Sequence, residues 1–444
     1  MNKLILVTGA TGYIASRLIP RLLDCGYRVR ALARDPHRLQ ARSWFNQIEI
    51  IQADVTTPST LAHACDGVDT AYYLIHNMSH GYGYTSLELD GARNFASAAE
   101  TAGIKHVIYL GGLADPEQHI APHMRSRIET GKVLRKGKVP VTEFRAGVIA
   151  GSGSISFEMI RFMTELFPII PAPSWMHNRS QPIAIQNIID YLIAALENKN
   201  GQGQVFEIGG LEIATYKDLM LRYAQLRGLQ RNMLILPYIP VWFMAFGVSL
   251  MTPVHYPIAY ALIAGLSADS IVKHPEALKV FPEVKLIDFD TATKDALEKT
   301  NPIYIERVWD LGKDFGSLSE RTSNAEDSLQ ASEVWLKHEG CFIDQRLTRI
   351  DSSSNEVIQA IENISGKHNW LIEVKEKNSR ILIRNFDQRY GNQWIDWRVD
   401  NKHLSQTVFF APRGLPGFLY WLLLYPFHII SFRGLIRGIT KQNI

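Results

Sequence analysis

The chain begins with MNKLILVTGATGYIASRLIPRLLDCGYRVRALAR, residues 1–34, and this stretch decides its fold. Residues 4–7 form a short apolar run of the kind that is buried in a parallel sheet. A glycine-containing segment, residues 8–15, follows at once, and an amphipathic segment, residues 16–25, comes next. Residues 28–33 then have the composition of a second strand. This order predicts a strand, a tight turn, a helix and a second strand.

The turn carries the small residues of a phosphate-binding motif. Gly9 would allow the tight turn, Gly12 would let the backbone approach a pyrophosphate, and Ala15 would let the helix pack closely on the sheet. The helix N-terminus would offer free N–H groups and its positive dipole end to the phosphates. An ordinary strand–helix turn that needs glycine is the alternative, but the strand–turn–helix context favours a dinucleotide site. The residues expected to bind the dinucleotide are Gly9, Thr11, Gly12, Tyr13 and Ile14.

The end of the second strand indicates which dinucleotide is bound. A site that prefers NAD places Asp or Glu there to accept hydrogen bonds from the ribose 2′-OH. Here the strand ends at Ala33 and Arg34 follows, whose guanidinium suits a 2′-phosphate. Asp35 precedes Pro36, so we expect it to be a turn residue that points away. We therefore expect NADP(H) to be preferred and NAD(H) to be possible, while a solvated surface arginine is the alternative for Arg34.

Strands and helices continue to alternate at a spacing typical of a Rossmann-like, doubly wound parallel sheet. The expected strands after the second are residues 48–53, 70–75, 106–110, 141–146 and 204–208, with helices at 84–102 and 124–135. Asp54 would lie at the carboxyl end of a strand, where it could reach the adenine amine, or it could be a turn or helix-cap aspartate. From about residue 151 to 290 the pattern is irregular, proline-rich and apolar, which suits a small lobe closing over the cofactor.

Composition excludes several classes of function. A formal charge of +3 over 444 residues does not indicate nucleic-acid binding. The cysteines, Cys25, Cys65 and Cys341, are isolated, and His76 and His80 have no partner at metal spacing, so we expect no metal site. The first strand begins at once, which leaves no room for a signal peptide, and we expect a cytoplasmic protein.

The last third of the chain has a different character. Residues 301–334 are predicted to be a linker, and residues 335–444 to be an α+β domain of antiparallel strands with a helix at 354–364 and a long apolar closing segment at 415–432. We expect Pro426 to kink this closing helix. We also expect the helix to pack against the sheet as part of the core. Because basic residues follow this helix, peripheral contact with a membrane is the alternative role. Pro426 and His428 disfavour a membrane-spanning helix.

Residues 1 to about 300 resemble the atypical short-chain dehydrogenases/reductases, close to the NmrA-like proteins and to the NADPH-binding accessory subunit of respiratory complex I. The resemblance is carried by residues 8–15, Arg34, Asp54, the strand 107–110 and the helix with His123 and Arg127. Residues 335–444 resemble the domain appended to bacterial NAD(P)-binding proteins of this kind, which is similar to helix-grip hydrophobic-ligand domains. The segments that carry this resemblance are residues 351–357, 409–415 and 421–437.

The resemblance implies catalytic positions that this chain fills differently. In active short-chain dehydrogenases a Ser polarises the carbonyl, a Tyr donates a proton, and a Lys four residues later supports the Tyr and the ribose. Here Gly111 and Gly112 follow the strand, and the Tyr and Lys positions read His123 and Arg127. Arg127 would keep a positive charge beside the ribose but cannot relay a proton. His123 could donate a proton, or it could pack the start of a helix without chemistry.

Two functions follow from these residues. The first is an oxidoreductase that reduces a hydrophobic carbonyl or alkene with NADPH, with His123 as proton donor and a hydrophobic small molecule as partner. The second is a non-catalytic NADPH-binding sensor or an assembly or quinone-associated factor, which would also explain the absent Ser, Tyr and Lys.

Overall fold

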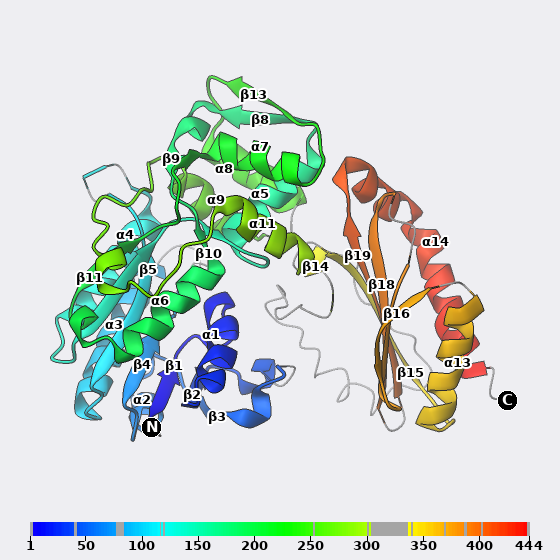
Figure 1. Ribbon diagram of the computed structural model, residues 1–444, viewed down its shortest axis with the longest axis horizontal. Coiled ribbons are helices and arrows are strands. Elements are labelled where there is room, and N and C mark those ends of the chain that lie inside the picture. Colours follow the sequence, from blue (N-terminus) through cyan, green and yellow to red (C-terminus); the bar gives the residue numbers. More distant parts are fainter. Residues whose placement is uncertain are drawn as a thin grey trace.

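A computed structural model describes most of the chain, in two parts connected by residues that lie outside the description (Figure 1). The described residues are 3–39, 42–76, 84–115, 117–118, 120–251, 254–299, 302, 336–338, 341–367, 370–385, 389–400 and 403–441. Nearly all of the expected linker, 301–334, and His80 therefore fall outside them.

The N-terminal part is built on a seven-stranded sheet in the order β11-β6-β5-β4-β1-β2-β3. Every pair of neighbouring strands is parallel. The strands are β1 (Leu4–Val7), β2 (Arg28–Ala33), β3 (Glu49–Gln52), β4 (Thr70–Tyr73), β5 (His106–Gly112), β6 (Val141–Ala146) and β11 (Val205–Ile208). The doubly wound parallel sheet predicted from the sequence is confirmed, including its seventh strand.

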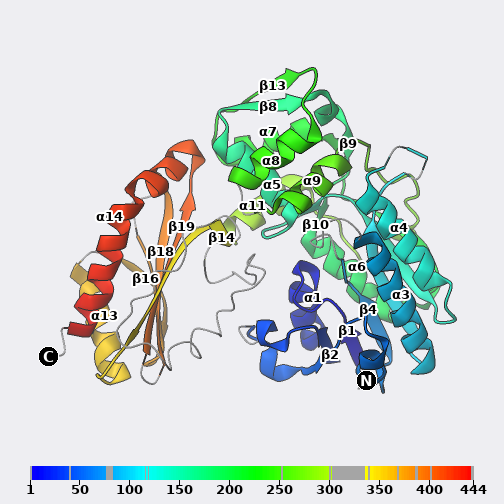
Figure 2. The same ribbon diagram turned by 180° about the vertical axis from the view of Figure 1, so that it is seen from behind.

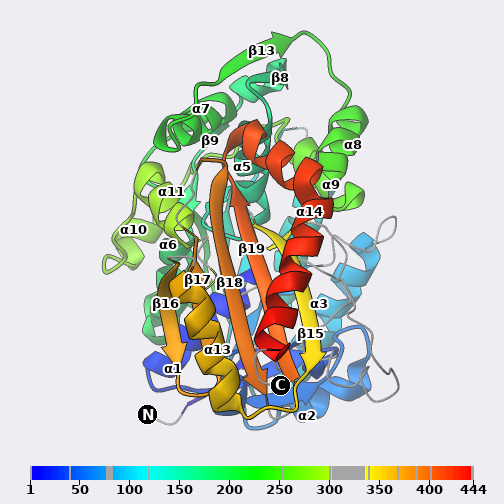
Figure 3. The ribbon, with the colours of Figure 1, turned by 90° about the vertical axis from the view of Figure 1, so that its right-hand side faces the viewer.

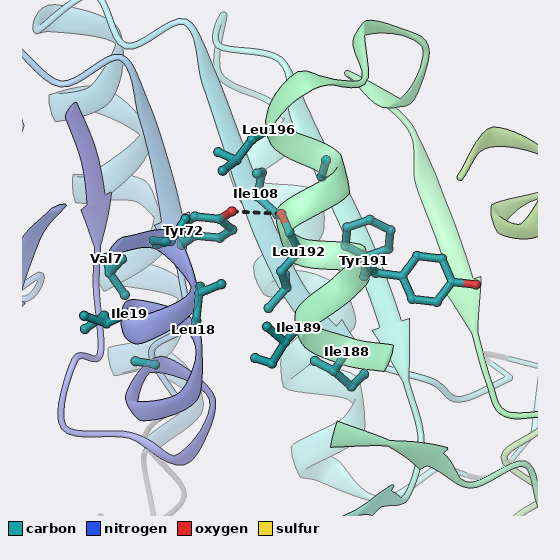
Figure 4. Close-up of a cluster of buried hydrophobic side chains, with 14 of the residues drawn as sticks. Val7, Leu18, Ile19, Tyr72, Ile108, Ile188, Ile189, Tyr191, Leu192 and Leu196 are labelled. Carbon is teal, nitrogen blue, oxygen red and sulfur yellow. Dashed lines mark hydrogen bonds between the residues drawn. The ribbon is translucent and has the colours of Figure 1, made fainter. Parts of the chain in front are cut away.

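Helices cover both faces of this sheet, as the alternation of side chains along buried strands requires. Ile5 and Val7 face the core shared with α1 (Tyr13–Asp24) and α6 (Ile185–Glu197). Leu4 and Leu6 face the core shared with α2 (Leu61–Cys65) and α3 (Tyr84–Thr101), to which α4 (Pro122–Arg135) also contributes. Figure 4 shows the first core, where the hydroxyl of Tyr72 on β4 donates a 2.8 Å hydrogen bond to the carbonyl of Leu192 on α6.

A lobe above the carboxyl ends of the strands contains short two-stranded sheets and apolar helices (Figure 1). Its strands are β7 (Ile149–Ala150), β8 (Ile169–Pro173), β9 (Arg179–Ser180), β10 (Ile183–Ala184), β12 (Ala214–Thr215) and β13 (Asn232–Leu236). Its helices are α5 (Ile155–Leu166), α7 (Tyr216–Leu226), α8 (Val241–Met251), α9 (Tyr256–Gly265) and α11 (Phe289–Glu298). The short helix α10 (Ala277–Val280) packs against β11, in the core shared with α6.

The C-terminal part is a six-stranded antiparallel sheet with two helices on one face (Figure 3). The strand order is β14-β15-β19-β18-β17-β16. The strands are β14 (Leu336–His338), β15 (Cys341–Arg349), β16 (Leu371–Glu376), β17 (Arg380–Arg384), β18 (Gly391–Asp400) and β19 (His403–Pro412), and the helices are α13 (Ser354–Lys367) and α14 (Gly414–Lys441). The expected α+β organisation is present.

The closing helix continues through its internal proline. Helix α14 runs for 28 residues, so Pro426 does not end it. Proline removes the N–H that would bond to the carbonyl of Leu422. Because Leu422 is 54% exposed, water can satisfy that carbonyl and the helix continues.

The two parts contact each other through the lobe. The carboxylate of Glu165, at the end of α5, accepts a 2.7 Å bond from Arg227 and a 2.6 Å bond from the backbone N–H of Gly414, where α14 begins. Phe162 of α5 meets Phe418 of α14 edge to face, at 6.4 Å between ring centroids. Since Glu165 is only 3% exposed, this paired carboxylate fixes the start of α14 against the lobe.

Candidate functional site

The turn after β1 has the geometry expected of a phosphate-binding turn. Gly9 has φ +65°, and a Cβ atom there would lie 2.8 Å from the carbonyl oxygen of Leu74, so no side chain is tolerated. The N–H of Gly12 donates to the carbonyl of Gly9 at 2.8 Å, and the N–H of Leu74 donates to Thr8 Oγ1 at 3.1 Å. The turn is thereby held against the end of β4, at the carboxyl edge of the sheet.

The N-terminus of α1 is suited to binding an anion. Gly12 is its N-cap, no acidic residue occupies its first turn, and no side chain of the described residues caps it. Ala15 is 1% exposed, which gives the close packing predicted for it. Thr11 and Ile14 are partly buried beside the turn, whereas the Tyr13 ring packs inward with the Arg17 guanidinium over it, 4.1 Å from its centroid. The five predicted residues thus form one turn and the start of one helix.

Arg34 is exposed at the end of β2, on the same edge of the sheet. Oδ1 of Asp35 accepts a 3.1 Å bond from the N–H of His37, so Asp35 is the turn residue that Pro36 led us to expect. Asp54 also serves a turn, because its Oδ1 accepts 2.9 Å bonds from both the N–H and the hydroxyl of Thr56. No acidic side chain therefore competes with Arg34 among the described residues of this strand end.

The loop after β6–β7 closes over the start of α1. Nη2 of Arg17 donates a 2.6 Å bond to the carbonyl of Ser152, and the N–H of Gly153 donates a 2.9 Å bond to Oε1 of Glu158. Burial raises the pKa of Glu158, and the nearby Arg161 and the bond from Gly153 oppose that rise. Ser152 and Ser154 are buried in this loop, which joins the glycine turn to the lobe.

A buried polar network lies beside the glycine turn. Glu88 of α3 is 4% exposed, and its carboxylate contacts Nδ1 of His76 and accepts a hydrogen bond from the hydroxyl of Ser126 on α4. Burial lowers the pKa of His76; the charge of Arg127 adds to that effect and Glu88 opposes it. In the part of the chain that the structure describes, Nε2 of His76 has no hydrogen-bond partner. Such an orphaned buried atom suits a bound polar group.

Sequence reasoning singled out His76 but missed Glu88 and Ser126. A signal for Glu88 was present, since it occupies the first position of an apolar row at helical spacing. The row consists of Glu88, Ala92, Phe95 and Ala99, all at most 4% exposed. A carboxylate in such a row is costly unless it is paired, and is therefore a candidate for function.

His123 is the second residue of α4 and is 4% exposed. Its imidazole lies against α9, where a Cβ atom on Gly265 would be 2.8 Å from its Cε1. Burial lowers the pKa of His123 to about 3, and the charge of Arg127 adds to the effect. The near-neutral pKa that would make His123 a ready general acid is therefore absent, and at pH 7 its imidazole is neutral.

The neighbouring strand end supplies no substitute acid. Tyr109 is 3% exposed, and its hydroxyl donates a 2.9 Å bond to the carbonyl of Arg127. Burial raises its pKa well above the ordinary value. A Cβ atom on Gly112 would lie 2.7 Å from the side chain of Met124 and 3.0 Å from that of Arg127, so α4 packs directly on the strand where a catalytic hydroxyl would project.

The low pKa of His123 predicts a pH dependence of stability. Between pH 6.5 and about 4 the unfolded chain binds a proton at this residue and the folded chain does not, so the free energy of unfolding should decrease as the pH falls. The loss should approach about 1.4 kcal/mol per pH unit for this one group. Urea unfolding of the wild type and of His123→Gln at several pH values measures it. An unchanged slope in His123→Gln would rule the effect out.

An apolar pocket opens in the lobe next to His123. Ile263 of α9 and Leu266, which directly follows α9, line it on either side of Gly265, which lies against His123. Five methionines contribute to its wall, namely Met159, Met163, Met176, Met220 and Met244. The hydroxyl groups in the lining belong to Ser156 and Tyr216. Flexible, polarisable methionines suit an apolar ligand of irregular shape.

With this geometry in place, comparisons with known proteins give a consistent result. Residues 1–187 match the model of the NmrA-like family. The match includes the first part of the lobe, from β7 to β10, whereas the rest of the lobe and the C-terminal part lie beyond it. The N-terminal part has a Rossmann-like fold that is also found in solved structures of reductases and epimerases.

Individual proteins resemble the chain over parts of its length. It is 31% identical over 115 residues to a 3 beta-hydroxysteroid dehydrogenase/Delta 5-->4-isomerase of Mycobacterium tuberculosis, which is 24% of this chain and 30% of that protein. It is 26% identical over 235 residues to a (4-alkanoyl-5-oxo-2,5-dihydrofuran-3-yl)methyl phosphate reductase of Streptomyces griseus, covering 51% of this chain and 74% of that protein. The chain thus spans less than a third of the first relative and about three quarters of the second.

Solved structures agree on the fold. The structure of the Citrobacter sp. triphenylmethane reductase complexed with NADP(H) superposes with a TM-score of 0.54, at 19% identity, over 66% of this chain and 99% of that one. At this identity the likeness concerns the fold of the N-terminal part alone.

Proposed function

We propose that this protein is an NADP(H)-dependent reductase that acts on an apolar carbonyl compound or alkene. The observation that carries the proposal is the position of the apolar pocket, whose wall at Ile263 and Leu266 adjoins His123, a neighbour of His76 beside the glycine turn. A site that joins a nucleotide-binding turn to an apolar cavity brings a hydride donor and an apolar acceptor together.

The residues present fit NADP(H), with NAD(H) possible. Gly9, Gly12 and the first turn of α1 would hold the pyrophosphate, Arg34 the 2′-phosphate, and Arg127 the nicotinamide ribose. Oδ1 of Asp54 accepts hydrogen bonds within a local turn, so its Oδ2 would be the atom that reaches the adenine amine. When bound, NADPH would supply a hydride from its nicotinamide ring. The NADP(H) complex of triphenylmethane reductase supports this assignment by its fold.

The chain's own groups would orient the substrate and exclude water. The neutral imidazole of His123 carries one N–H that can donate a hydrogen bond to a substrate oxygen, but it holds no additional proton at pH 7. The pair of His76 and Glu88, bonded to the hydroxyl of Ser126, would fix the imidazole of His76 with Nε2 available to the crevice. The apolar lining of the pocket would keep water from the reacting atoms.

A non-catalytic NADPH-binding sensor, or an assembly or quinone-associated factor, is the second candidate. It is favoured by Gly111 and Gly112, which offer no hydroxyl, and by the low pKa of His123. We further propose the kinship of the N-terminal part with the complex I accessory subunit and of the C-terminal part with helix-grip domains. The long α14 packed across an antiparallel sheet supports the second kinship.

Chain-length dependence of NADPH oxidation tests the proposed reductase. With 2-pentanone and 2-undecanone as a matched pair, the longer ketone should give at least a hundredfold higher kcat/KM, because each buried CH₂ contributes about 0.8 kcal/mol. The corresponding enals form a second pair. Ala172→Phe, which narrows the pocket at a residue 1% exposed, should remove most of this preference and leave NADPH affinity unchanged. Tight NADPH binding without oxidation on any probe would favour the sensor.

A further inference from the structure

Two long uncharged stretches of the chain carry most of its exposed large apolar side chains. From Asn232 to Ala268, and again from Gly414 to Phe432, the sequence has no Asp, Glu, Lys or Arg. In the structure these stretches form β13, α8 and α9 of the lobe and the first two thirds of α14. Contiguous exposed apolar surface of this kind marks a site of contact with a partner or a membrane.

Helix α14 separates its two faces sharply. On one face Trp421, Phe432 and Ile436 are at most 3% exposed and pack into the core of the C-terminal sheet. The opposite face carries an apolar row of four residues at helical spacing. This apolar row consists of Leu419, Leu423, Phe427 and Ile430, exposed by 45%, 70%, 68% and 69%. A soluble helix would place polar side chains on that face.

Positively charged residues follow the apolar row along α14. Two turns beyond Ile430 the same row continues with Arg437, which is exposed. Arg433 and Lys441 are the other charged residues of α14, and the helix contains no acidic residue. A helix that is apolar along one face and basic at the end of that face matches a bilayer surface, where acyl chains lie beside anionic headgroups.

Helices α8 and α9 add aromatic side chains of the kind that prefer a membrane interface. Trp242, Phe243 and Phe246 of α8 are 59%, 57% and 55% exposed, and Tyr256 and Tyr260 of α9 are 41% and 44% exposed. These rings combine an apolar body with, in Trp and Tyr, a polar tip. Other residues of the same two helices line the apolar pocket, so α8 and α9 form its cover.

The two exposed sets lie close to each other in the molecule. Helix α5 contacts both α8 and α14, which places them within one helix of each other. Figures 1 and 2 show the start of α14 next to the lobe that carries α8 and α9.

We infer that the protein docks peripherally on an anionic lipid bilayer, through the apolar row of α14 and the aromatic side chains of α8 and α9. Gly414–Thr440 is the helix of the described residues that is long and apolar enough to cross a membrane. A span would expose Trp421 and Ile436, now at most 1% exposed, and strip α14 from its sheet, so surface docking is the arrangement that keeps both contacts. The positively charged end of α14 also suits an anionic surface better than a second copy that carries the same charge.

Flotation with lipid vesicles tests the inference on the full-length protein. Wild type should float with vesicles of phosphatidylcholine and phosphatidylglycerol, and at least tenfold less with phosphatidylcholine alone. Leu423→Ser/Phe427→Ser should reduce binding to the anionic vesicles at least tenfold. Leu211→Ser/Ile213→Ser is the matched control, because Leu211 and Ile213 are 63% and 52% exposed in the N-terminal part; it should bind as wild type does.

Four outcomes would overturn the inference. Wild type that stays with the soluble fraction for both vesicle types shows that no docking occurs. Equal binding by the wild type and Leu423→Ser/Phe427→Ser shows that α14 is not the contact. Resistance to alkaline carbonate extraction would show insertion instead of docking. A dimer in lipid-free solution that Leu423→Ser/Phe427→Ser converts to a monomer would assign the face to a second copy of the chain.

Discussion

Gly12→Val should weaken NADPH binding at least a hundredfold while the protein stays folded. Gly12 has φ −79°, which valine adopts readily, but its side chain would fill the approach to the N-terminus of α1. Charge-assisted hydrogen bonds to a phosphate contribute about 1.5–3 kcal/mol each, and the loss of two such bonds exceeds a factor of one hundred. Calorimetric titration with NADPH measures the change.

The fold is checked in the same samples by circular dichroism and thermal unfolding. A Cβ atom on Gly12 would lie 3.0 Å from the carbonyl oxygen of Gly9, so a small loss of stability is expected. Gly137→Val is a matched control, since its Cβ would meet the carbonyl oxygen of Leu134 at 3.4 Å, far from the turn. If Gly12→Val is folded and binds NADPH normally, the pyrophosphate does not bind at this turn.

The second large effect concerns the C-terminal sheet, where Arg346→Leu should reduce the free energy of unfolding by about 3–5 kcal/mol. Asp344 and Arg346 lie two residues apart on β15 with fully buried side chains, joined at 2.8 Å. Tyr425 of α14 donates a 2.9 Å bond to the same carboxylate oxygen of Asp344. Removing the guanidinium leaves a buried carboxylate without its counter-charge, which is the costly part of the change.

Urea unfolding followed by tryptophan fluorescence measures this effect, because Trp394, Trp397 and Trp421 lie in the same domain. Arg398→Leu is the control: Arg398 also pairs with an aspartate, at 3.1 Å, but is 62% exposed and should cost less than about 1 kcal/mol. Asp344→Leu/Arg346→Leu should recover much of the loss. Equal costs for Arg346→Leu and Arg398→Leu would contradict the account.

The sequence predicted features that depend on local geometry. The turn itself requires a positive φ at residue 9, so the presence of a glycine there indicates this conformation. Asp35 could be assigned to a turn because Pro36 restricts its backbone. The succession of strands and helices along the chain followed from apolar runs separated by helical segments, a pattern typical of a doubly wound parallel sheet.

Features that depend on contacts between distant segments could not be predicted in the same way. Glu88 meets His76 and Ser126 only because α3, α4 and the end of β4 converge, and single-sequence patterns do not show partners. The pKa of His123 is set by its burial and by Arg127, neither of which the sequence pattern shows.

The central claim is that the crevice binds NADP(H) through the glycine turn and Arg34. Calorimetric titration of the wild type and of Arg34→Ala with NADPH and NADH tests it most directly. Because a charge-assisted contact to the 2′-phosphate contributes about 1.5–3 kcal/mol, the wild type should bind NADPH at least tenfold more tightly than NADH. Arg34→Ala should bind both nucleotides with similar affinity. Equal affinities in the wild type, or a preference that survives Arg34→Ala, would contradict the account.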